Sequence, residues 1–166
     1  MFSGPAAVKC YQAMSLRALL ASVVLVCTAT AQKYEGPRPP KPDLPYLKHA
    51  DTLLATEAAE ARTDRKKDET RYIIDGANSP AKTPLAAPIL LFQSGKINPE
   101  NLQLFKLESK EGHRELSPQK SGEPILVEVT KLDGALSKIE PNNGLDPGEY
   151  GFLLSGTNQL FCFAVF

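Results

Sequence analysis

The chain has 166 residues, and its 19 lysines and arginines are balanced by 19 aspartates and glutamates. Because there is no basic excess, we expect neither a nucleic acid nor an anionic membrane surface as its partner. Three cysteines, two histidines and no tryptophan leave few residues for disulfides, metal sites or stacking against sugars.

A secretory signal peptide is predicted over residues 1–31. Arg17 supplies the positive charge, Ala18–Cys27 form the apolar run, and Ala29-Thr30-Ala31 supplies the small residues of a cleavage site. The apolar run is shorter than a bilayer span requires, so we expect no integral membrane span after cleavage. Met14 begins a complete n-region by itself, and a start at Met1 or at Met14 stays open.

The exported chain is expected in the periplasm or outside the cell. Cleavage after Ala31 removes Lys9 and Arg17 from the 19 basic residues, which leaves 17 against 19 acidic ones. It also removes two of the three cysteines, so Cys162 is left without an intramolecular disulfide partner. The hydrophobic core must therefore stabilise the fold by itself.

Two segments precede the predicted domain. Residues 32–47 hold five prolines, which predict an extended segment that acts as a semi-rigid spacer or as a strap lying on the domain. Residues 48–69 are ambiguous, because alanine and glutamate favour a helix while the apolar residues form no helical stripe. We favour an irregular or β-hairpin arm over a helix there.

Residues 70–166 read as one all-β domain. Alternating or wholly apolar runs are separated by turn-forming residues, and the turn at Glu111-Gly112 is of the type that joins two strands of a hairpin. The runs are TRYIID, PLAAPILLF, NLQLFKLES, HRELS, EPILVEVTKL, ALSKIE and the two halves of GEYGFLLSGTNQLFCFAVF. About seven strands in a domain of this size predict an antiparallel, immunoglobulin-like β-sandwich.

The C-terminal run predicts a closing hairpin with a turn at 155–158. Tyr150, Phe152 and Leu154 alternate with their neighbours and are expected to face the core, together with Phe161, Phe163 and Val165 on the returning strand. Cys162 and Phe166 fall on the opposite row. That face is partly apolar too, and we expect the Pro-rich strap or a partner to cover it.

No catalytic, cofactor-binding or metal-binding residue is predicted. Gly95-Lys96 follows a strand but lacks the remaining residues of a phosphate-binding loop. His113 alternates with Glu115 beside Glu111, which provides too few ligands for a structural metal. Cys162 lies within a strand with no neighbouring base and is interpreted as an inert buried thiol.

The domain resembles a group of small exported bacterial proteins of unassigned function. The resemblance rests on the runs YIIDGANSP at 72–80, ILLF at 89–92 and LFKL at 104–107, on Arg114, and on LDPGEY at 145–150. It implies a signal peptide and a β-sandwich domain that ends in an L-x-P-G-E-Y hairpin. It implies no catalytic residues.

These observations favour an exported, non-enzymatic binding or structural module of the cell envelope. Its partner is unknown, with an envelope protein or polymer as the expected class. A small outer-membrane β-barrel is one alternative, because Leu160, Cys162 and Ala164 alternate before a terminal Phe166, although its strands need about 9 to 11 residues each. An enzyme whose site is assembled from distant loops is the other alternative.

Overall fold

The computed structural model describes residues 33–66 and 69–166 of the chain. The predicted signal peptide at 1–31 lies outside the described residues. Gln32–Phe166 form one compact unit, which consists of antiparallel sheets packed together. The all-β, sandwich-like prediction is therefore confirmed.

The first sheet has the strand order β10-β11-β7-β1-β2. Its strands are β1 Pro45–His49, β2 Thr52–Ala55, β7 Ile89–Gln93, β10 Val127–Asp133 and β11 Leu136–Pro141. β7 pairs with β1 on one side and with β11 on the other, as its wholly apolar run predicts. Pro88 stands immediately before β7, where its missing N–H removes no hydrogen bond from the sheet.

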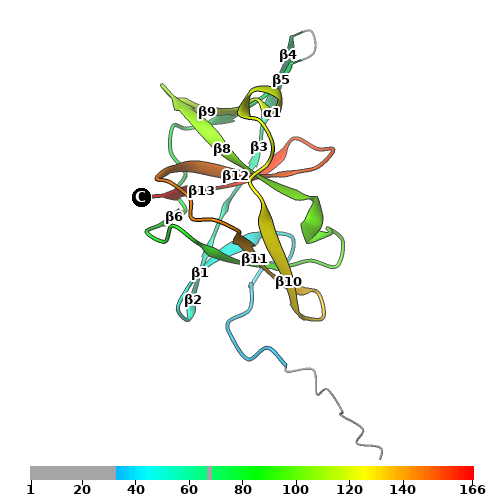
Figure 1. Cartoon of the computed structure of the whole chain (residues 1–166). Coiled ribbons are helices and arrows are strands. Elements are labelled where there is room, and N and C mark those ends of the chain that lie inside the picture. The colour runs from blue at the N-terminus through cyan, green and yellow to red at the C-terminus, as the bar shows by residue number, and fades with distance from the viewer. Residues whose placement is uncertain (1–32, 67–68) are drawn as a thin grey trace, which may run out of the picture. The chain divides into compact units, whose positions relative to one another are not determined.

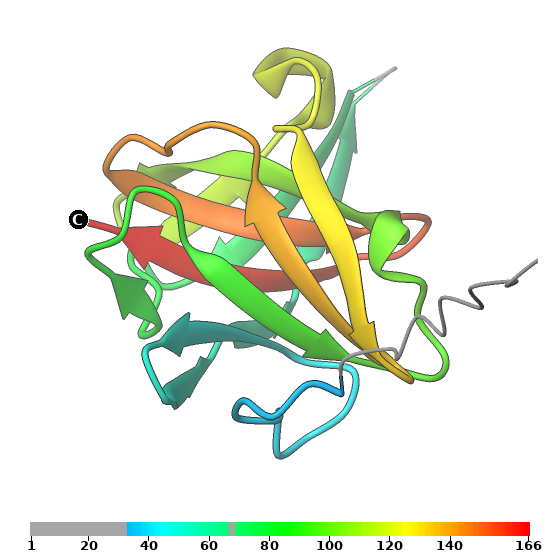
Figure 2. The ribbon, with the colours of Figure 1, turned by 60° about the horizontal axis from the view of Figure 1, so that its bottom comes forward.

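The second sheet has the order β3-β13-β12-β8-β9-β5-β4, with β6 paired in parallel to β13. Its strands are β3 Glu57–Glu60, β4 Arg62–Lys66, β5 Glu69–Asp75, β6 Lys82–Thr83, β8 Leu102–Lys110, β9 His113–Leu116, β12 Gly148–Leu154 and β13 Gln159–Val165. Two short helices, η1 Pro99–Asn101 and α1 Pro118–Ser121, lie in the connections. Figure 2 shows the two sheets as layers, with β7, β10 and β11 in one and β12 and β13 in the other.

The second sheet closes on itself. β3 and β4 stand at opposite ends of its strand order, yet only Ala61 separates them in sequence. The Ala61 N–H donates to the carbonyl of Asn158 at 2.9 Å. Thr56 alone separates β2 from β3, so one extended run over 52–66 passes from the first sheet into the second (Figure 1).

Two apolar cores result, one on each side of the β12–β13 hairpin. The larger core fills the space between the sheets and includes Leu47, Leu90, Phe92, Leu104, Ile139, Tyr150, Phe152, Phe161 and Phe163. The smaller core fills the inside of the closed sheet and consists of Ala61, Ile74, Phe105, Leu107, Leu116, Leu153, Leu160 and Cys162. Both faces of the hairpin are therefore buried.

The C-terminal hairpin has the predicted turn and the predicted rows. Tyr150 pairs with Phe163 and Phe152 with Phe161, and all four side chains lie in the larger core. The covering of the opposite row was predicted wrongly. Cys162 is covered by the chain's own closed sheet and not by the Pro-rich strap or a partner.

The segments before residue 70 belong to the same sheets as those after it. Residues 52–66 form β2, β3 and β4, as the favoured β-arm predicts, and these strands pair with β1, β13 and β5. A separation between an arm at 48–69 and a domain beginning at 70 is therefore not seen. The strand number exceeds seven, and the immunoglobulin-like type is not confirmed, because that fold stacks two open sheets.

The Pro-rich segment lies against the first sheet. Arg38 forms an ion pair with Asp133 at the end of β10. The Asp43 N–H donates to the carbonyl of Gln93 at 2.9 Å, and the Ser94 hydroxyl donates to the Asp43 carboxylate at 2.5 Å. These contacts fit the strap interpretation for residues 33–44, whereas residues 45–47 belong to β1 and form part of the first sheet.

Candidate functional site

A buried arginine stands inside one end of the closed sheet. Arg114 has no exposed surface, because it alternates with His113 and Glu115 on β9 and shares its inward row with Leu116. Its Nη1 and Nη2 donate to Glu57 Oε2 and Oε1 at 2.7 and 2.9 Å. This bidentate pairing offsets the burial that would otherwise lower the pKa of Arg114, and the pKa is raised.

The loop after β5 caps this end of the sheet. Arg114 Nε donates to the carbonyl of Gly76 at 2.8 Å, and Nη2 donates to the carbonyl of Asp75 at 3.1 Å. Gly76 has φ +88°, a conformation that glycine adopts without steric cost. The Ser109 hydroxyl donates to the carbonyl of Ala77 at 2.5 Å. The guanidinium of Arg114 therefore binds both the capping loop and the Glu57 carboxylate.

Glu149 connects this buried cluster with the surface. Its Oε2 accepts a hydrogen bond from the Ser79 N–H at 3.0 Å and lies 3.7 Å from Arg114 Nη1. Burial raises the pKa of Glu149, while the Ser79 N–H, Arg114 and Lys82 oppose that rise. Glu149 consequently takes up a proton more readily than an ordinary glutamate.

Two lysines stand beside Glu149 around a surface depression of about 340 Å³. Lys82 comes from β6 and Lys106 from β8, and Asn78 and Phe166 also line the depression. Neither lysine forms an ion pair with any residue that the structure describes. Lys106 Nζ lies 5.9 Å from the centre of the Tyr150 ring, a cation–π contact that orients it.

The groups near the depression suit binding better than covalent chemistry. Cys162 pairs with Glu57 across the strands, and burial raises its pKa to about 12, so the thiol stays protonated at neutral pH. The Ser79 side chain is fully buried, and its hydroxyl has no hydrogen-bond partner. The site therefore offers a ligand the two ammonium groups of Lys82 and Lys106 and the carboxyl group of Glu149, which gains a proton easily.

A second concavity of about 440 Å³ lies between the loop at 94–100 and the β10–β11 hairpin. Lys96 and Lys131 line it, and Ile97 and Val129 are its apolar members. It is larger than the depression at Glu149. No charged side chain among its lining residues is buried, whereas the depression at Glu149 has the buried carboxyl of Glu149, so that depression is the better candidate site.

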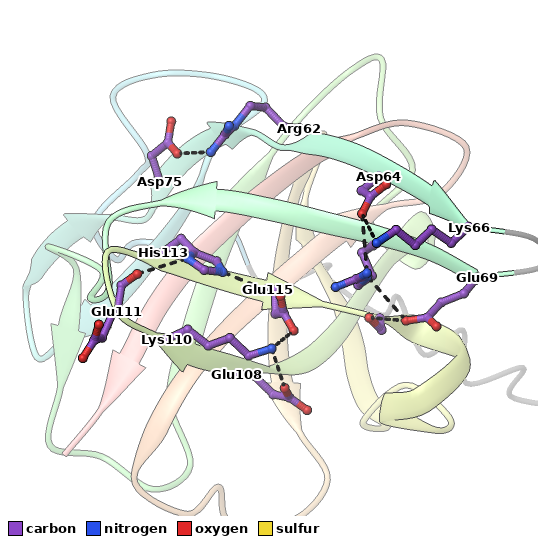
Figure 3. A network of polar contacts seen from close by, with 12 residues as sticks. Arg62, Asp64, Lys66, Glu69, Asp75, Glu108, Lys110, Glu111, His113 and Glu115 are labelled. Carbon is purple, nitrogen blue, oxygen red and sulfur yellow. Dashed lines mark hydrogen bonds and ion pairs between the residues drawn. The ribbon is translucent and has the colours of Figure 1, made fainter.

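The histidine and carboxylates considered for a metal lie on the outer face of the closed sheet (Figure 3). His113 Nε2 lies 3.6 Å from Glu115 Oε2, but Glu115 is bound by Lys110. That hydrogen bond holds the pKa of Glu115 below its usual value. Among the described residues, no group of three or more histidines, cysteines or carboxylates is placed to hold a metal ion.

The rest of this face carries ion pairs between neighbouring strands. Arg62 and Asp75 are 2.6 Å apart with side chains 70% and 81% exposed, and Asp64 faces Arg71 at 3.5 Å. Positive and negative side chains alternate across β4, β5 and β9 (Figure 3). Such a surface is well solvated, and its charges are already paired.

The sequence prediction missed the buried cluster. Glu57 lies in an ambiguous stretch whose alanine and glutamate favour a helix, and Arg114 lies in HRELS, which was predicted as a strand after the Glu111-Gly112 turn. One signal was available: in HRELS, Arg114 shares its row with Leu116, which places it on the apolar side of the strand. Gly95-Lys96, the other stretch considered, lines the second concavity.

Comparison with known proteins returns no match: no family model, no curated protein and no solved structure corresponds to this chain. Within the part of the chain that the structure describes, no helix combines the length and the apolarity needed to cross a membrane.

Proposed function

We propose that the chain is an exported, non-enzymatic binding module of the cell envelope that takes an anionic ligand in the depression at Glu149. The two lysines beside Glu149, with no ion-pair partner among the described residues, carry this proposal. Carboxylate and phosphate groups are the anions that such ammonium groups bind.

The neighbouring residues narrow the ligand class. Phe166 is 69% exposed at the edge of the depression, and it offers an apolar contact next to the lysines. We therefore expect a small molecule or polymer end that joins an anionic group to an apolar part. The Arg114 cluster keeps the capping loop in place and so positions Lys82, which follows that loop on β6.

Binding can be tested by NMR titration of the purified chain with inorganic phosphate, acetate and hexyl phosphate. We expect shifts of the amide signals of Lys82, Lys106 and Glu149, with hexyl phosphate binding more tightly than inorganic phosphate. The Lys82→Ala/Lys106→Ala variant should lose these shifts.

A matched control is available in the second concavity. Lys96→Ala/Lys131→Ala removes the same charge from two lysines that line the other hollow, and it should bind as the unmodified chain does. Equal losses of anion binding in both double variants would mean that binding depends on net charge alone. That result would contradict the proposed site.

Export is tested separately by cell fractionation and N-terminal sequencing of the mature protein. The signal-peptide prediction and the resemblance to small exported bacterial proteins support a mature chain that begins at Gln32 outside the cytoplasm. An intact N-terminus in a cytoplasmic fraction would contradict this part of the proposal without affecting the binding test.

A further inference from the structure

The loop between β11 and β12 contains the dipeptide Asn143-Gly144, and both residues are exposed. An asparagine followed by glycine is the arrangement in which the next backbone nitrogen meets least steric hindrance when it approaches the side-chain amide. We propose that Asn143 is a site of spontaneous deamidation, at which the protein acquires an aspartate and an isoaspartate.

The backbone nitrogen of Gly144 is free to react. Among the described residues, no backbone or side-chain acceptor receives its N–H, although Asn142 donates to the carbonyl of Leu126 at 3.0 Å and Leu145 to that of Ala86 at 2.7 Å. The side-chain amide of Asn143 also has no hydrogen-bond partner in the described part of the chain. Both reacting groups are therefore free of competing hydrogen bonds in the described part of the chain, and both residues are open to water.

The reaction needs only water. The Gly144 nitrogen attacks Cγ of Asn143 and forms a new N–C bond, while the Cγ–N bond of the amide breaks and the nitrogen leaves as ammonia. The resulting succinimide is then hydrolysed at either carbonyl. One product has aspartate at 143, and the other has isoaspartate, which lengthens the backbone by one methylene. Each adds one negative charge.

Other asparagines of the chain provide internal contrasts. Asn98 precedes Pro99, which has no N–H to attack with. Asn101 is exposed like Asn143, but the backbone N–H of Leu102 donates to the carbonyl of Pro99. The side-chain amide of Asn158 donates to the carbonyl of Ala61 at 3.0 Å. Each of the three lacks one of the conditions that Asn143 meets.

Gly144 is not required by the fold, which gives the test its main variant. Its φ lies outside the left-handed region, and a Cβ added there would come no closer than 3.7 Å to Ala86. Gly144→Ala should therefore fold normally while its methyl group hinders the attack. Unchanged amide dispersion in the NMR spectrum checks the fold.

The experiment ages the full chain in mildly alkaline buffer at physiological temperature and maps deamidation by peptide mass spectrometry with an isoaspartate-specific methyltransferase assay. We expect conversion concentrated at Asn143, with isoaspartate present, and its near-complete loss in Gly144→Ala. Conversion at Asn101 or Asn158 as fast as at Asn143, or an equal rate in Gly144→Ala, would overturn the proposal.

Discussion

Removing the charge of Arg114 should destabilise the domain far more than removing any surface charge. In Arg114→Met, a shorter, unbranched apolar side chain replaces the stem of the arginine. Glu57 and Glu149 then lose their buried cation, and the carbonyls of Asp75 and Gly76 lose their donors. Breaking one side of a buried ion pair costs about 3 to 5 kcal/mol. Because the Glu57 side chain keeps 24% exposure and can be partly hydrated, we expect the lower part of that range.

Urea denaturation at neutral pH, followed by circular dichroism, measures this loss. Arg62→Met is the matched control, since Arg62 also pairs with a carboxylate but both side chains are mostly exposed; exposed pairs contribute at most about 1 kcal/mol. Adding Glu57→Gln and Glu149→Gln to Arg114→Met should restore part of the stability, because the uncompensated charges disappear. Equal midpoints for Arg114→Met and Arg62→Met would refute the assigned role of the cluster.

Three further measurements follow from the fold. Phe163→Ala should lower the free energy of unfolding by about 3 to 5 kcal/mol, because the Phe163 ring is fully buried against Tyr150 and Phe152. Phe166→Ala, at an exposed position, should leave the free energy of unfolding almost unchanged. Similar denaturation midpoints for the two variants would contradict the two-core arrangement. The raised pKa of Glu149 means that the folded state binds more protons than the unfolded state just above pH 4.5, so this residue's contribution to stability falls as pH rises. The free energy of unfolding of Glu149→Gln should therefore increase relative to that of the unmodified chain as pH rises from there. A constant difference between the two free energies would exclude this linkage. Ala50 has φ +50° in the β1–β2 turn, so Ala50→Gly should raise stability by up to about 1 kcal/mol, and a lower denaturation midpoint would show that the turn is not strained.

The C-terminal hairpin could be predicted because its information is local. Tyr150, Phe152, Phe161 and Phe163 alternate around a turn of small polar residues, and period-two alternation determines which face each side chain occupies. The pattern also marked the opposite row as apolar. It did not reveal what covers that row, since the covering strands come from another part of the chain.

The closure of the second sheet could not be predicted from local pattern. Residues 57–66 carry small or charged side chains. Ala61 is buried in the smaller core, and Ala59 packs against that core. A closed sheet this narrow leaves room for small side chains at such a position, but alanine and glutamate are also good helix formers. Local propensity favours a helix over residues 57–66, but burial of Ala61 in the smaller core favours the strands that are found.

The candidate site was missed for a related reason. Arg114 and Glu57 are distant in sequence, and neither carries a motif. Lys82 and Lys106 come from different strands, so their approach to Glu149 depends on the parallel pairing of β6 with β13. Only Arg114 could have been recognised from the sequence, because it shares its row of the strand with Leu116.

The extended run over 52–66 has a consequence for the order of events during folding. β3 is formed from residues near the start of the unit, but its partner in the sheet is β13, the final strand of the described chain. Until β13 is available, β3 lacks this partner strand, and the smaller core stays open to water. Contacts between such distant segments slow folding because the intervening chain must be ordered first. Sheet closure should therefore be the late step, and a chain that ends before residue 159 would contain β1 to β12 without a finished smaller core.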